Sequence, residues 1–115
     1  MTVTSPWDHD SHIPFADITW ADDAPGIRAR EQHVDGRRWA IVEYAQGARR
    51  EQWCRDGHLG LVLEGAIRYE FEDGREALTA SGGEAFSLST CRAHRGRNIA
   101  DAPTRLFLID DPEPG

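Results

Sequence analysis

Residues 59–74 read LGLVLEGAIRYEFEDG, and this stretch decides the fold class. It begins with the short apolar run Leu59–Leu63, which ends at the turn residues Glu64-Gly65. Ala66–Phe71 then alternates, with apolar or aromatic side chains on one face and charged ones on the other. Such alternation is typical of a half-buried β-strand. Asp73-Gly74 marks the next turn, so the stretch predicts strand, turn, strand and turn.

The same pattern continues on both sides of this stretch. Asp35-Gly36 separates two further strand candidates and favours a tight hairpin in which both turn residues have positive φ. No window of 11 or more residues shows convincing helical periodicity. Short strands about ten residues apart predict an all-β sandwich or barrel. The other expected strands are Ile27–Val34, Arg38–Ala45, Arg75–Thr79, Ala85–Leu88 and Arg105–Ile109.

The length and charge of the chain limit the functions that it can have. A chain of 115 residues has room for one domain with one core. The net charge of -7 argues against a nucleic-acid partner. All 13 basic residues are arginine, which excludes lysine-based catalysis. No apolar run is long enough for a membrane span, and no leader pattern is visible. We therefore expect a cytoplasmic protein in which Cys54 and Cys91 are free thiols.

Residues 1–26 differ from the rest of the chain and are expected to form an extended N-terminal arm. Their prolines prevent a long regular element. The arm also holds Trp7, Phe15 and Trp20, which are costly to leave in water. We interpret it as packing over the barrel or over a second subunit of a homodimer; the alternative is a disordered tail. The barrel is expected at residues 27–111, followed by a short C-terminal tail at 112–115.

In two segments, the spacing between particular residues matches two known sequence motifs that occur together. In the second, Gly83 is followed at motif spacing by His94 and Asn98, while Ser89 and Cys91 stand where the signature has proline and a second glycine. The first ends at Gly65, and its glutamate position holds His58. Trp53–Asp110 thus resembles the cupin family. The sequence Glu51-Gln52-Trp53-Cys54 before Gly57-His58 is also similar to a subgroup of small cupins named for a Trp-Cys motif.

The two histidine positions of the first segment can be read in two registers. A three-residue spacer places Gln52 and Cys54 there, whereas a four-residue spacer places Glu51 and Trp53 there. We prefer the first register, because Gln52 and Cys54 would share one strand face and both can donate to a metal.

The resemblance implies a cupin-type jelly-roll β-barrel, the double-stranded β-helix, with a metal site at its mouth. The candidate ligands are Gln52, Cys54, His58 and His94. Thiolate and imidazole suit a divalent transition metal, Zn or Fe. Gln52 is a weaker ligand and could instead hydrogen-bond a bound water. Each residue also has a purely structural interpretation: Cys54 as a small buried side chain, His94 as a core histidine and His58 as the remnant of an abandoned site.

Three functions stay open. The first is a metal-dependent enzyme acting on a small molecule, such as an oxygenase or isomerase. The second is a non-catalytic cupin that binds or senses a small molecule and has lost the usual ligands; a subunit acting only through its surface is a third possibility. Gly60 is expected to leave space beneath the site. Arg49-Arg50 is interpreted as a solvated loop or as a contact for an anionic substrate.

Overall fold

The computed structural model describes residues 8–114. Trp7 of the expected arm and Gly115 of the expected tail lie outside the described residues. The described part of the chain is all-β, apart from a 3-10 turn at Phe15–Asp17. Its strands are β1 (Ala21–Ala24), β2 (Ile27–Val34), β3 (Arg37–Tyr44), β4 (Gly57–Glu64), β5 (Ala66–Phe71), β6 (Leu78–Ser81), β7 (Ala85–Leu88), β8 (His94–Asn98) and β9 (Thr104–Asp111).

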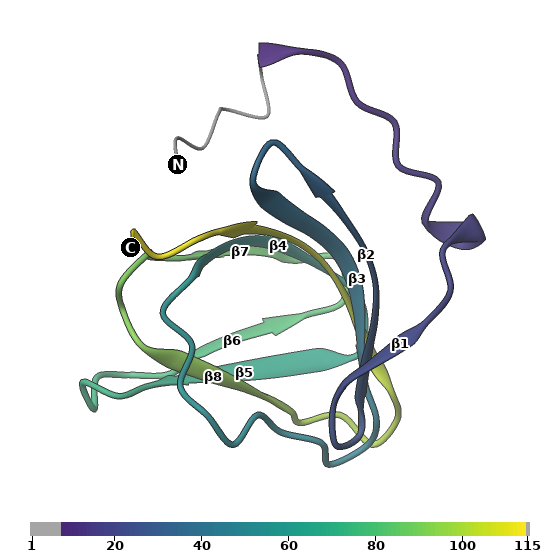
Figure 1. The fold of residues 1–115 in the computed structure, drawn as a ribbon. Coiled ribbons are helices and arrows are strands. Elements are labelled where there is room, and N and C mark those ends of the chain that lie inside the picture. Colours follow the sequence, from purple (N-terminus) through teal and green to yellow (C-terminus); the bar gives the residue numbers. More distant parts are fainter. Residues whose placement is uncertain (1–7, 115) are drawn as a thin grey trace.

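The strands form two antiparallel sheets that face each other (Figure 1). The larger sheet has the order β1-β2-β3-β9-β4-β7, and the smaller has the order β6-β5-β8. Strands distant in sequence are neighbours, because β9 lies between β3 and β4. The inward side chains of both sheets form one core, which includes Val42, Ile67 and Leu106. This is the arrangement of a jelly roll, and the all-β expectation is confirmed.

The hairpins form where the sequence predicts them. Asp35 and Gly36 both have positive φ, 52° and 79°, as a tight hairpin turn requires. β2 and β3 then pair without a break from Val34↔Arg37 to Ile27↔Tyr44. In β5 the alternation decides which side chains are buried: Ile67, Tyr69 and Phe71 face the core and Arg68 faces solvent.

Three strands differ from the sequence expectation. β6 begins at Leu78 rather than Arg75, because the turn continues: the Asp73 carboxylate accepts the backbone N–H of Arg75 at 2.9 Å. β8 was not predicted, since its buried positions are His94, Gly96 and Asn98 and carry no apolar period. β1 lies inside the expected arm and pairs with β2.

The described part of the arm packs against the outer face of the larger sheet. The Phe15 ring meets the Phe107 ring edge-on with centroids 6.0 Å apart. Arg30 donates a hydrogen bond to the Phe15 carbonyl at 3.0 Å. The Trp20 ring is contacted by the guanidinium groups of Arg28 and Arg30 at 4.4 and 4.3 Å. Phe15 and Trp20 are therefore half-buried against the sheet, which removes part of their apolar surface from water.

Cys91, which stands where the signature has its second glycine, has a backbone conformation that favours glycine. Its φ is 72°, in the left-handed region that residues with a β-carbon avoid. Its side chain is exposed and forms no disulfide with Cys54, so the expectation of free thiols is confirmed. The exposed thiol is not a core residue.

This strain predicts that Cys91→Gly stabilises the protein. Relief of the left-handed strain outweighs the added flexibility of the unfolded chain, so the free energy of unfolding is expected to rise by about 0.5–1 kcal/mol. Urea denaturation measures it. Cys91→Ser keeps the β-carbon and is the matched control; equal stability of the glycine and serine variants would contradict the strain argument.

Candidate metal centre

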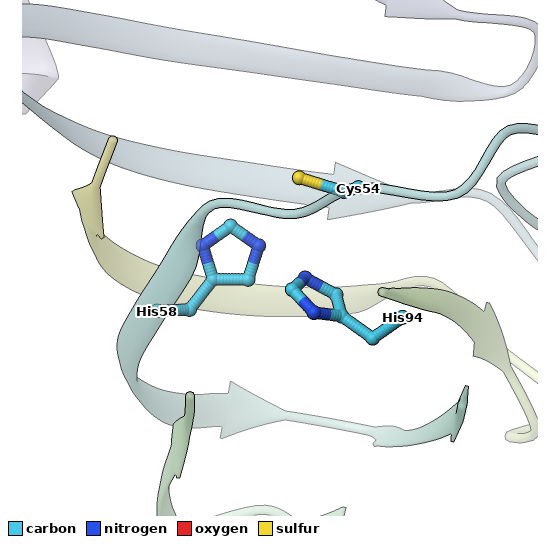
Figure 2. Close-up of side chains that lie close together, drawn as sticks. All are labelled: Cys54, His58 and His94. Carbon is cyan, nitrogen blue, oxygen red and sulfur yellow. The ribbon is translucent and has the colours of Figure 1, made fainter. Parts of the chain in front are cut away.

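Cys54, His58 and His94 come together at one end of the space between the sheets (Figure 2). One potential ligand atom from each lies within 4.8 Å of the others. Cys54 comes from the segment between β3 and β4, His58 from β4 and His94 from the start of β8. Among the described residues, this is the one group of three or more His, Cys, Asp and Glu side chains that could share an ion.

Backbone pairing fixes Cys54 beside His94. The Cys54 N–H donates to the His94 carbonyl at 2.8 Å, and the His94 N–H donates to the Cys54 carbonyl at 2.9 Å. This isolated antiparallel bridge attaches the segment before β4 to the edge of the smaller sheet. The thiol therefore belongs to the same wall of the cavity as the His94 imidazole.

His58 is oriented from the opposite sheet. The pairing of β4 with β9 sets His58 directly opposite Asp110. The His58 Nδ1 lies 2.8 Å from an Asp110 carboxylate oxygen, which holds the Nδ1–H and leaves Nε2 for another partner. Asp110 is itself buried and meets Arg38 Nη1 at 3.3 Å. A carboxylate behind a histidine is a common support for a metal ligand.

His94 presents one unused nitrogen. The residue is 1% exposed, and its Nδ1 donates to the Arg92 carbonyl at 3.0 Å. Its Nε2 is buried and makes no hydrogen bond with any described residue. Because Nδ1 holds the proton, Nε2 has a free lone pair. A buried polar atom without a partner is costly, and a bound cation would remove that cost.

The electrostatics of the metal-free cluster favour charge separation. Burial raises the pKa of the Cys54 thiol, but interactions with the surrounding groups, above all the hydrogen bond with the His58 imidazole, outweigh it and lower the pKa to about 6. Burial lowers the pKa of His58, but Asp110 and Cys54 together raise it to about 9. Burial also raises the pKa of Asp110, yet His58 and Arg38 lower it further, so the carboxylate stays ionised. Near neutral pH, Cys54 is therefore a thiolate beside a charged His58.

The three side chains line a cavity of about 940 Å³. The space is large enough for a small molecule. Gln52 is exposed and lines the same cavity, from the bend before Cys54, so its role as a ligand stays a prediction. Other residues lining the cavity are Asp23, Glu31, Arg38, Tyr44, Arg50, Trp53, Tyr69, Leu108 and Asp110.

The expectation for Gly60 was wrong. A β-carbon at this position would lie 2.4 Å from Cζ of Phe86 and 2.9 Å from a methyl carbon of Leu108. The missing side chain therefore makes room for the Phe86 ring in the core rather than for a ligand. Asn98, which matches the signature, is also structural: its amide donates to the carbonyls of Tyr44, Ala45 and Ala102.

Sequence reasoning missed Asp110 and Arg38. The last expected strand ends at Ile109, whereas β9 continues to Asp111 and Asp110 faces inward. Its alternation with the buried Leu106 and Leu108 was the available signal. Arg38 was counted only as a strand residue, and no local pattern relates it to Asp110.

Comparison with solved structures relates this architecture to known proteins. No family model matches the sequence, and no curated protein matches it significantly. An RmlC-like cupin from Shewanella frigidimarina aligns over 90% of this chain and 92% of its own with a TM-score of 0.71 and 16% identity. The chain has the cupin fold.

Two further structures have the same fold. KdgF from Halomonas sp. aligns over 91% of this chain and 96% of its own, with a TM-score of 0.69 and 23% identity. A mutant of oxalate decarboxylase OxdC from Bacillus subtilis aligns over 90% of this chain but only 31% of its own length, with a TM-score of 0.68 and 20% identity. Within residues 8–114, no helix is long and apolar enough to cross a membrane.

The lowered pKa predicts an unusually reactive thiol. In metal-free Cys91→Ser protein, the rate of Cys54 alkylation by iodoacetamide is expected to be high at pH 7. As the pH is lowered, the rate is expected to fall with a midpoint near pH 6, because the thiolate becomes protonated there. Mass spectrometry after timed quenching gives the rate at each pH. His58→Gln removes the main stabilising partner, so its midpoint is expected to move upward. The same midpoint in both proteins would contradict the assigned cause.

Proposed function

We propose that this cupin binds one divalent transition metal through Cys54 Sγ and the Nε2 atoms of His58 and His94, and that it acts on a small molecule in the adjoining cavity. The reaction class that we propose is a metal-dependent oxygenation or isomerisation. The buried, unpartnered Nε2 of His94 beside the thiol carries the proposal.

The donor set fits such an ion. One sulfur and two imidazole nitrogens suit Zn or Fe, whereas Mg²⁺ and Ca²⁺ prefer oxygen. Three protein ligands leave at least one position open for a water or a substrate. A bound ion would supply Lewis acidity or, if it is iron, redox chemistry to a substrate oxygen.

The residues of the chain itself would hold and orient the substrate. Tyr69 lines the cavity, and burial raises its pKa well above the ordinary value, so its hydroxyl remains a neutral hydrogen-bond donor. Arg50 is held by Asp23 at 2.6 Å and by the Tyr44 hydroxyl at 3.3 Å. These fixed polar groups support a small, oxygen-rich substrate, because such a molecule can use both cationic and neutral donors.

A homodimer formed through the outer face of the larger sheet completes the proposal. Leu59, Leu61 and Leu63 project from β4 away from the core and are 50%, 36% and 47% exposed. Apolar side chains gathered on one face are typical of an interaction surface.

Metal content tests the function directly. Protein purified from metal-supplemented medium is expected to hold about one equivalent of a transition metal by elemental analysis, as one three-ligand site requires. Cys54→Ser, His58→Gln and His94→Gln are each expected to lose it while keeping the native circular dichroism spectrum. His33→Gln, at an exposed position in β2, is the matched control and is expected to keep it.

Folded wild-type protein that holds no stoichiometric transition metal would overturn the proposal. Stabilisation by a small molecule that survives chelation would then favour the non-catalytic binding function.

Asp110 is expected to support the site without touching the metal. Asp110→Asn keeps the size of the side chain but removes the charge that holds His58 Nδ1–H. Metal affinity is expected to fall about 10- to 100-fold, as for other carboxylates behind a ligating histidine. Competition with a chromophoric chelator measures it. Asp111→Asn, one residue along β9 and half-buried, is the control; an equal loss in both variants would contradict the specific role of Asp110.

A further inference from the structure

Three arginines lie in one row across the outer face of the smaller sheet. Arg68 of β5 is paired directly opposite Arg97 of β8, and Arg97 forms an isolated bridge with Arg49. All three are exposed, because the inward positions beside them belong to Ile67, Gly96 and Asn98. This surface is separate from the core side of the sheet, where His94 lies.

Arg68 and Arg97 form no direct ion pair within the described chain. Neither guanidinium makes a hydrogen bond or an ion pair with any of residues 8–114. Directly opposite side chains on neighbouring strands have β-carbons only about 4.5–5.5 Å apart, and like charges there repel. The chain has a net charge of -7 and acidic residues in excess, yet among residues 8–114 none forms an ion pair with either of these two arginines.

The neighbouring charges are already matched. Arg95 pairs with Glu70 and packs over the Trp53 ring at 4.1 Å, while Arg49 reaches Glu51 at 3.1 Å. The pKa of Glu70 lies below its ordinary value, mainly through the hydrogen bond from Arg95, with Arg97 and Arg49 adding attraction. This surface therefore has two positive charges in excess, because it holds four guanidinium groups (Arg49, Arg68, Arg95 and Arg97) and two carboxylates (Glu51 and Glu70).

The surface is also hollowed. A depression of about 240 Å³ is lined by Arg49, Arg50, Glu51, Arg68, Glu70, Arg95, Gly96 and Arg97. Its volume suits a compact anion rather than an extended ligand. Arg49, Glu51 and Arg95 also border the barrel cavity, so the two spaces meet at the rim.

We propose that this arginine hollow binds a phosphate group, with Arg68 and Arg97 as its principal ligands. Two uncompensated positive charges match the dianion. Planar guanidinium groups from adjacent strands can each donate two hydrogen bonds to a tetrahedral oxyanion. Binding removes the repulsion between Arg68 and Arg97. The site requires no metal and none of the residues of the Cys54 cluster.

The test is titration of the full chain with inorganic phosphate, at constant ionic strength set with chloride, by calorimetry and by NMR of the arginine Nε–H groups. Saturable one-to-one binding is expected, with shifts at Arg68 and Arg97. Arg68→Gln and Arg97→Gln are each expected to weaken it at least about tenfold, the loss that accompanies one charge-assisted hydrogen bond. Arg75→Gln makes the same change in net charge at a different surface and is expected to bind as the wild type does.

Further variants and controls distinguish a phosphate site in the arginine hollow from anion binding at the metal centre. Cys54→Ser and chelator-treated protein are expected to bind phosphate unchanged, which distinguishes the hollow from the metal centre. Without phosphate, Arg97→Gln is expected to melt no lower than the wild type, because it relieves a repulsion. No saturable binding, equal weakening by Arg75→Gln, or succinate binding as tightly as phosphate would overturn the assignment.

Discussion

Two backbone hydrogen bonds between Cys54 and His94 are the constraint on which the site depends. They attach a segment without regular strand structure to the edge of the smaller sheet and bring the thiol beside an imidazole from a distant part of the sequence. The larger sheet supplies the third group, because the pairing of β4 with β9 carries His58 to the same place. The cluster therefore exists only when both sheets have formed. This coupling makes the site a property of the jelly roll and not of any one strand.

Both histidines are oriented by a hydrogen-bond acceptor at Nδ1, but the acceptor differs. Asp110 holds Nδ1–H of His58, and the Arg92 carbonyl accepts Nδ1–H of His94. In both rings the remaining nitrogen is left for the cluster. Without a cation, the thiolate of Cys54 and the charge on His58 stabilise each other. A bound cation would displace the Nε2 proton of His58, and the freed lone pair would become a ligand beside the thiolate and the Nε2 of His94. Cys54 offers the cluster a sulfur donor, which is softer than an imidazole nitrogen.

Sequence patterns predicted the features that local chemistry controls. Alternation in Ala66–Phe71 and the Asp35-Gly36 turn gave correct strands, and motif spacing brought Cys54, His58 and His94 into one hypothesis. The failures have a common cause, because they depend on long-range packing. Asp110 acquires its role only through the register of β4 against β9, 52 residues from His58. The space at Gly60 is taken by the Phe86 ring of the neighbouring strand. β8 escaped prediction because glycine and polar residues fill its buried face.

The most direct test of the metal centre is X-ray absorption spectroscopy at the edge of the bound metal in the wild-type protein. The account predicts one sulfur and two imidazole rings in the first coordination shell, with loss of the sulfur in Cys54→Ser. A shell of oxygen and nitrogen alone, unchanged by that substitution, would show that Cys54 does not bind the ion and would contradict the account.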